Sequence, residues 1–233
     1  MSSRIAVLVS GRGSNLQALH AYLARAGGAE VALVVSDRAS SGALTWARER
    51  AIATAVLDAG PDEATTLLDL FRTHHVEFVV LGGYLRLVPP EVVRTYHRRM
   101  VNVHPALLPA FGGPGMYGHR VHRAVLQSGA RVSGPTVHFV DEIYDHGQVI
   151  AQWPVPVLSG DDEASLAARV LRVEHLLLPQ VVHRLTADRG KPGEGAWPSR
   201  TVGDSERVAF LLGAPADNAF ADNVAASFAG IRS

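Results

Sequence analysis

The stretch Met100-Val101-Asn102-Val103-His104-Pro105-Ala106-Leu107-Leu108-Pro109 contains an apolar strand pattern that stops at a proline. Side chains alternate between the two faces of a strand, so Asn102 and His104 point the same way. Pro105 cannot donate to a sheet ladder, and we therefore expect the backbone to leave the sheet directly after His104. Open α/β sheets bind their ligands where strands end in this way. The stretch predicts a polar site at a strand exit, although a core histidine with a capping asparagine would have the same local sequence.

Strand and helix patterns alternate on the N-terminal side of this stretch. The apolar runs at 4–10, 30–36, 54–57 and 78–81 are short and nearly continuous, which is typical of strands buried on both faces. Helical spacing of apolar residues follows over 15–25, 43–50, 62–74 and 90–96. This alternation predicts an α/β fold with a Rossmann-like, mostly parallel sheet, flanking helices and right-handed crossovers.

The pattern changes on the C-terminal side. Residues 111–118 hold four glycines and a proline, which predicts a turned loop before a helix over 120–128. The runs 132–140 and 148–157 predict strands that pair as an antiparallel hairpin or as edge strands. A long helix is expected over 162–185, kinked at Pro179. We assign residues 1–187 to a catalytic domain and residues 188–233 to a tail, with a short helix expected around 207–212.

The composition limits the classes of function. The chain of 233 residues carries 22 Lys plus Arg against 22 Asp plus Glu, so no global basic field indicates a nucleic-acid or anionic-membrane partner. It has no cysteine, which excludes disulfides, thiolate metal sites and a cysteine nucleophile. The first apolar run is too short for a signal peptide or a membrane span. We expect a cytoplasmic monomer or homodimer with small-molecule substrates.

The turn Ser10-Gly11-Arg12-Gly13-Ser14-Asn15 joins the first predicted strand to the first predicted helix. Consecutive backbone N–H groups at a helix start, flanked by small side chains, suit a phosphate group. A dinucleotide fold remains an alternative, because Asp37 after the second strand would suit a ribose contact. That fold, however, favours a glycine at position 16, where this chain has Leu16. The turn therefore favours a phosphate loop.

A histidine pair raises the question of a metal site. His119 and His122 are three residues apart and can share a helix face. No thiolate, carboxylate or third histidine stands beside them at ligand spacing, so we predict no metal.

Four blocks of the sequence together resemble the signature of the formyltetrahydrofolate-dependent formyltransferases. They are Ser10–Gln17, Leu81–Arg86, the Asn102 stretch, and Thr136–Val140 continuing to Asp145-His146-Gly147. Over residues 4–187 their order and spacing are similar to those of the branch that formylates the amine of 5-phosphoribosylglycinamide in de novo purine biosynthesis. The resemblance implies 10-formyltetrahydrofolate as co-substrate and no metal.

The resemblance also implies roles for individual residues. Catalysis would fall to Asn102, His104 and Asp145. Ribotide binding would fall to Gly13, Ser14, Asn15, Gly83 and Glu174, and folate binding to Leu85, Arg86, Leu87, Val88, Val140 and Asp141. Local sequence alone would also allow a surface arginine at Arg86, a solvated helix charge at Glu174 and a solvated turn acid at Asp145.

Alternatives and departures remain. A formyltetrahydrofolate hydrolase would be expected to carry an additional N-terminal regulatory domain, and a methionyl-tRNA formyltransferase a C-terminal RNA-binding domain and a basic surface. An inactive phosphosugar-binding regulator is the alternative from another class. Residues 111–118 form a longer connection than the Phe-Pro-Gly step of many relatives, and His146 replaces a frequent small residue.

Overall fold

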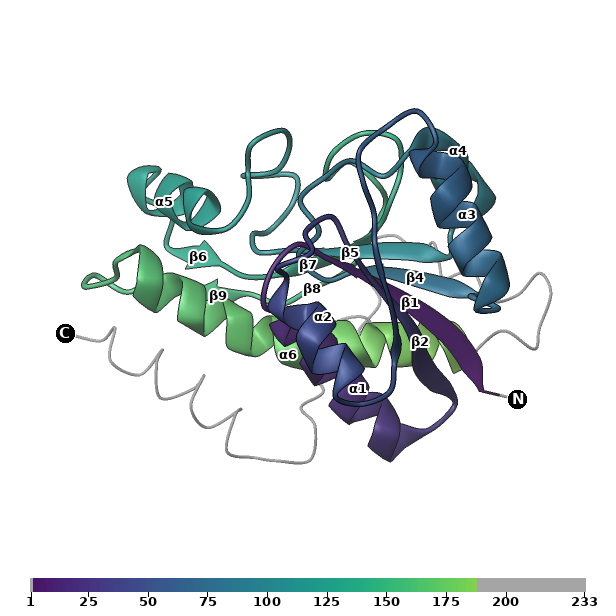
Figure 1. The fold of residues 1–233 in the computed structure, drawn as a ribbon. Coiled ribbons are helices and arrows are strands. Elements are labelled where there is room, and N and C mark those ends of the chain that lie inside the picture. The colour runs from purple at the N-terminus through teal and green to yellow at the C-terminus, as the bar shows by residue number, and fades with distance from the viewer. Residues whose placement is uncertain (1, 188–233) are drawn as a thin grey trace. The chain divides into compact units, whose positions relative to one another are not determined.

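The computed structural model describes residues 2–187, which form a central sheet flanked by helices (Figure 1). The strands are β1 (Ser3–Val9), β2 (Ala29–Ser36), β3 (Ala53–Val56), β4 (Phe78–Leu81), β5 (Met100–His104), β6 (Val132–Ser133), β7 (Thr136–Phe139), β8 (Val149–Gln152) and β9 (Val155–Pro156). The helices are α1 (Ser14–Ala26), α2 (Gly42–Arg48), α3 (Glu63–Thr73), α4 (Pro90–Thr95), α5 (His119–Gln127) and α6 (Glu163–Ala187).

The main sheet has seven strands in the order β3-β2-β1-β4-β5-β7-β8. Strands β1 to β5 pair in parallel, whereas β7 runs antiparallel to both β5 and β8. The chain builds outward from β1 in one direction and then returns to build in the other. Such a reversal opens a crevice at the carboxyl ends of the strands. The expected α/β fold, with antiparallel strands at its C-terminal edge, is confirmed.

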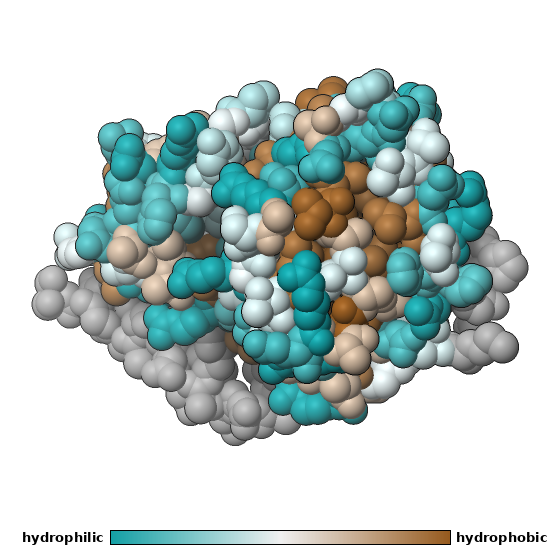
Figure 2. Space-filling model, viewed as in Figure 1, coloured by the Kyte–Doolittle hydropathy of each residue, from teal (hydrophilic) through white to brown (hydrophobic). Residues whose placement is uncertain are grey.

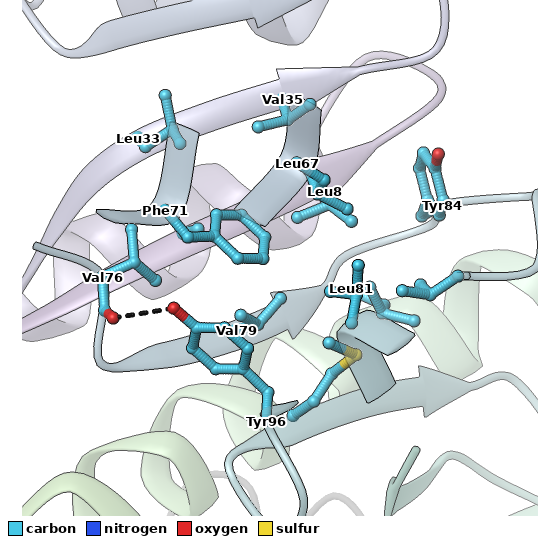
Figure 3. Close-up of a cluster of buried hydrophobic side chains, with 14 of the residues drawn as sticks. Leu8, Leu33, Val35, Leu67, Phe71, Val76, Val79, Leu81, Tyr84 and Tyr96 are labelled. Atoms are coloured by element: carbon cyan, nitrogen blue, oxygen red, sulfur yellow. Dashed lines mark hydrogen bonds between the residues drawn. The ribbon is translucent and has the colours of Figure 1, made fainter. Parts of the chain in front are cut away.

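Alternation along β1 directs side chains to two hydrophobic layers. Ala6 and Leu8 face a cluster that includes Phe71 of α3 and Tyr96 beside α4 (Figure 3). In this cluster the Tyr96 hydroxyl donates a hydrogen bond to the Val76 carbonyl at 3.0 Å, so its one polar group is satisfied. The neighbouring side chains of β1 point to the opposite face, which α1 and α6 cover (Figure 1). Burial of the sheet on both faces explains the continuous apolar runs of its strands.

The two expected C-terminal strands are each broken into two. A Cβ at Gly134 would lie 1.9 Å from the Trp153 carbonyl oxygen, so only glycine fits between β6 and β7. Pro154 interrupts the partner run between β8 and β9. As a result β7 and β8 join the main sheet, while β6 and β9 pair in a separate two-stranded sheet.

Helix α6 begins at a cluster of polar contacts. Asp161 accepts two hydrogen bonds from Arg169, at 2.6 and 2.8 Å, which lower the pKa of its carboxyl to about 2. The helix continues past Pro179, where a kink was expected, and runs on to Ala187. The short helix expected around 207–212 lies outside the described residues.

The face of the molecule in Figure 2 is mostly hydrophilic, with hydrophobic residues visible near its middle.

Within residues 2–187, no helix combines the length and the apolar character that crossing a bilayer requires.

Candidate active site

A cavity of about 490 Å³ opens at the carboxyl ends of β4 and β5, a size typical of small-molecule sites. The segment after β4, the turn after β5, the loop before α5, the turn after β7 and one face of α6 all contribute to its lining. Twelve of the fourteen predicted site residues line it: Asn15, Gly83, Leu85, Arg86, Leu87, Val88, Asn102, His104, Val140, Asp141, Asp145 and Glu174. The tertiary structure therefore brings together residues that are far apart in the sequence.

Asn102 and His104 occupy the end of β5, where the backbone turns out of the sheet. The turn is held by Thr136 of β7, whose hydroxyl donates to the Ala106 carbonyl at 2.6 Å and accepts from the Leu108 N–H at 3.0 Å. Thr136 stands opposite His104 in the antiparallel register. The strand pairing thus determines where both functional side chains emerge.

Asp145 reaches this strand end from the turn after β7. Its carboxylate lies 3.4 Å from His104 Nδ1 and accepts hydrogen bonds from Asn102 Nδ2 at 3.4 Å and from the Gly113 N–H at 3.0 Å. Its own backbone is left-handed, with φ of 54°, a conformation that non-glycine residues adopt only under constraint. Burial raises the pKa of the carboxyl, but the hydrogen bond and charge of His104 outweigh this, so the net pKa is below the ordinary 3.8.

His104 is only 3% exposed, and both of its ring nitrogens face oxygen atoms. Nε2 lies 2.8 Å from the Phe111 carbonyl oxygen, and Nδ1 faces Asp145. Neither oxygen can donate a proton. An imidazolium can donate to both oxygens, whereas a neutral ring can donate to only one of them.

His138 is a buried contact of Asn102 to which the sequence assigned no role. It stands opposite Asn102 in the β5–β7 register, and its Nε2 lies 3.1 Å from Asn102 Nδ2. Its Nδ1 donates to the Phe139 carbonyl at 2.8 Å, and burial lowers the pKa of the ring, so the neutral ring presents Nε2 as an acceptor. A histidine inside the short strand that pairs with β5 is the sequence signal that could have identified it.

The glycine-rich segment 111–118 forms part of the site wall. The Phe111 carbonyl oxygen contacts His104 Nε2, and the Gly113 N–H donates a hydrogen bond to the Asp145 carboxylate. A Cβ at Gly112 would lie 2.6 Å from the Leu108 side chain and 3.1 Å from Asp145 Cβ. The backbone of this segment therefore holds two of the three predicted catalytic residues.

Two predicted ribotide residues meet at the α6 side of the cavity. Asn15 Nδ2 donates to Glu174 Oε2 at 2.7 Å in a buried contact. Burial raises the pKa of the Glu174 carboxyl, while Asn15 and the charge of His104 act in the opposite direction. A glutamate held in this way is not the solvated helix charge that its local sequence would also allow.

Gly13 and Ser14 do not line the cavity, although they precede Asn15 at the start of α1. Gly13 has φ of 74°, and a Cβ there would lie 2.6 Å from Ala43 Cβ in α2. Close packing between two helices therefore already requires glycine at this position, whatever the turn binds.

The folate side of the prediction lies on the segment after β4. Leu85, the first of the predicted folate residues, is anchored by its backbone N–H, which donates a hydrogen bond of 3.0 Å to the Ser10 hydroxyl. Leu85, Leu87 and Val88 present apolar surface, and Val140 and Asp141 complete this side of the lining. Arg86 lines the cavity while forming an ion pair with Glu63 of α3.

Further residues line the cavity without having been predicted, among them Tyr84, Tyr117, His119, His122 and Tyr144. His122 is 4% exposed, its Nδ1 is buried without a hydrogen-bond partner, and burial lowers its pKa to about 4. Within residues 2–187, no group of three potential ligands stands close enough to hold a metal ion.

Comparison with known proteins identifies the family. The sequence model described as "Formyl transferase" matches residues 3–182, which is most of the chain. The chain belongs to the formyl transferase family. The resemblance found in the four sequence blocks is thereby confirmed.

Individual members of the formyl transferase family are similar over most of the chain. A chloroplastic phosphoribosylglycinamide formyltransferase of Vigna unguiculata is 44% identical over 192 residues, which is 80% of this chain and 62% of that protein. The phosphoribosylglycinamide formyltransferase of Escherichia coli is 37% identical over 198 residues, 82% of this chain and 91% of that protein. The chain thus spans somewhat less than two thirds of the plant relative and nearly all of the bacterial one.

Solved structures agree with this assignment. The crystal structure of the phosphoribosylglycinamide formyltransferase from Brucella melitensis matches with a TM-score of 0.74 at 37% identity, over 80% of this chain and 97% of that one. A formyltetrahydrofolate deformylase from Pseudomonas syringae has a TM-score of 0.71 at 22% identity, which indicates a shared fold only.

Proposed function

We propose that this formyl transferase moves the formyl group of 10-formyltetrahydrofolate to the amine of 5-phosphoribosylglycinamide, giving the N-formyl ribotide and tetrahydrofolate in purine biosynthesis. The observation that carries the proposal is the meeting of Asn102, His104 and Asp145 at one wall of the cavity. The relatives named phosphoribosylglycinamide formyltransferase support this choice of substrates.

The reaction requires stabilisation of an oxyanion. The amine nitrogen attacks the formyl carbon, the carbonyl π electrons move to oxygen, and a tetrahedral intermediate forms. Asn102 Nδ2 can donate to this oxygen, because its existing contact with Asp145 is long, at 3.4 Å, and a stronger acceptor can replace it. The contact with His138 keeps the amide oriented meanwhile. A protonated His104 can supply a second donor with charge assistance when its Nε2 exchanges the Phe111 carbonyl for this oxygen.

A proton must also leave the attacking amine and reach N10 of the folate as the C–N10 bond breaks. Asp145 is held charged by its contacts with His104 and the Gly113 N–H. It can accept the amine proton directly or through a water, and the proton then passes to N10. Formyl transfer in this scheme needs no covalent enzyme intermediate.

The ribotide would bind along α1 and α6. Glu174 presents a carboxylate to the cavity for ribose hydroxyls, with Asn15 holding its Oε2. The backbone N–H groups of Ser14 and Asn15 in the first turn of α1 would bind the phosphate, next to Gly13. Gly83, with φ of 82°, lines the cavity between this region and the folate segment.

The folate would lie against the segment after β4. Leu85, Leu87 and Val88 offer apolar surface for its ring system, and Val140 and Asp141 close the other side. The exposed Ile143 and Tyr144 extend this apolar surface toward the mouth of the cavity.

The decisive experiment measures tetrahydrofolate formation with and without the ribotide. The proposal predicts product only when both substrates are present, with stoichiometric N-formyl ribotide. Formate release in the absence of ribotide would instead indicate a hydrolase, and binding without any turnover would indicate a phosphosugar-binding regulator.

The compartment and the assembly state belong to the same proposal. We expect a cytoplasmic monomer or homodimer that has no nucleic-acid or membrane partner and needs no metal. The plant relatives are named as chloroplastic, so localisation of a tagged chain in its own cell is the direct test.

A further inference from the structure

Arg86 is the one lysine or arginine among the described residues that line the cavity. The acidic side chains of the lining are Asp141, Asp145 and Glu174. An anionic group on a ligand that enters this cavity therefore meets a single permanently charged cationic side chain.

That guanidinium already has a partner. Its Nη2 forms an ion pair with Glu63 at the start of α3, and its Nη1 donates to the Leu57 carbonyl at 3.3 Å. The side chains are 27% exposed for Arg86 and 12% for Glu63, so water screens the pair less than a surface pair. Glu63 itself does not line the cavity and acts on a ligand only through Arg86.

Two acidic side chains, Glu63 and Asp37, act on Tyr84 together with Arg86, and Asp37 also pairs with Arg38 at 3.9 Å. Glu63 Oε1 and Asp37 Oδ1 are both buried without a hydrogen-bond partner. The charges of Arg86, Glu63 and Asp37 all act on the Tyr84 phenol, whose pKa burial raises to about 12. Tyr84 therefore stays protonated, and its buried hydroxyl, which also lacks a partner, is available to donate to a carboxylate that leaves Arg86.

We propose that Glu63 determines how tightly the anionic tail of the folate co-substrate binds, by competing with it for Arg86. The inference rests on the proposed function, which supplies a ligand with a flat ring system and an anionic glutamate tail. The tail carboxylate must displace Glu63 or share an arginine whose charge Glu63 already balances. In both cases a neutral side chain at position 63 strengthens binding of the tail and leaves binding of the rings unchanged.

The test compares two ligands by calorimetric titration. One is 10-formyltetrahydrofolate, and the other is the primary amide of 10-formyltetrahydropteroate, in which a neutral carboxamide replaces the glutamate so that no anionic tail remains. Glu63→Gln keeps the side-chain length, and we expect it to lower the Kd of the glutamate-bearing ligand about three- to tenfold while leaving that of the other unchanged. High salt should reduce the gain.

Two further variants complete the design. Asp69→Asn removes a charge from the same helix, where Asp69 pairs with Arg72 at 2.6 Å on the exposed surface, and should change neither Kd. Arg86→Gln should weaken binding of the glutamate-bearing ligand only. Adding Glu63→Gln to Arg86→Gln should not restore that affinity.

The outcomes separate the inference from the proposed reaction. Equal changes for both ligands, or no change in Glu63→Gln, would mean that Glu63 only anchors α3 and would overturn the inference. If Glu63→Gln fails to fold by circular dichroism, an Arg86→Gln protein that binds both ligands like the wild type would overturn it as well. A gain in Glu63→Gln that is confined to the glutamate-bearing ligand, without ribotide-dependent turnover in the wild type, would support the role of Glu63 and reject the proposed reaction.

Discussion

Asp145 is the side chain through which the three predicted catalytic residues are connected. It contacts His104, Asn102 and the backbone of Gly113 from a left-handed backbone conformation. A strained residue is retained when its surroundings over-determine its position, and here three partners do so. Because its net pKa lies below the ordinary aspartate value, the carboxylate remains charged throughout the neutral range.

Asn102→Ala removes the proposed oxyanion donor. We expect kcat to fall on the order of 10²- to 10³-fold, the typical loss for one such donor, with little change in the Kd of either substrate. Steady-state kinetics and calorimetry on the same preparation provide the measurement. A loss below about tenfold in a folded protein would argue that another group stabilises the oxyanion.

Asp145→Asn keeps the shape of the side chain but removes the charge beside His104. Because Asp145 and His104 form one charged pair in the proposed mechanism, we expect each single change to lower kcat strongly. A His104→Ala, Asp145→Asn double variant should lose far less than the product of the single losses. Fully multiplicative losses would show that the two side chains act independently.

At the scale of single elements, the 111–118 loop positions the site through backbone atoms rather than side chains. Gly112 leaves no room for a Cβ between Leu108 and Asp145. Gly112→Ala should therefore push Asp145 out of place and lower kcat by about ten- to a hundredfold. Gly115→Ala is a less suitable comparison because its φ is positive, so Gly160→Ala, with open space around it, serves as the matched control for kcat.

Helix α5 contributes His122, whose depressed pKa couples stability to pH. The unfolded chain binds a proton near the ordinary pKa of 6.5, whereas the folded chain does so only near 4. Stability is therefore fully present above pH 6.5 and declines as pH falls toward 4. His119, His104 and Glu163 face the ring and modify the effect. The decline should be on the order of 1–3 kcal/mol. Urea unfolding at pH 7 and pH 5 should show a smaller difference in His122→Gln than in the wild type.

At the scale of the whole molecule, the described cavity is built entirely from residues 15–174. The family match ends at residue 182. Residues 204–233 have few periodic apolar positions, so we expect a chain that ends at residue 203 to fold and to keep kcat within about twofold. Activity and thermal unfolding of the shortened chain are the measurements. Loss of soluble expression would show that the removed segment stabilises the remainder.

The order of elements could be predicted from the sequence because short-range patterns determine it. Continuous apolar runs such as that of β1 indicate double burial, and Pro105 marks the end of β5 within one residue. The two broken C-terminal strands were not predicted, since the break at Gly134 depends on how closely the Trp153 backbone approaches. That approach involves a segment about twenty residues away and leaves no local pattern.

The sequence by itself determined the α/β class, the placement of Asn102 and His104 on one strand face, and the family to which the chain belongs. Only the tertiary structure decided that His138 contacts Asn102, that the 111–118 backbone holds Asp145 and His104, and that Glu63 occupies Arg86. The physical reason is range: side-chain periodicity is a property of neighbouring residues, whereas these contacts depend on strand register and loop closure across tens of residues.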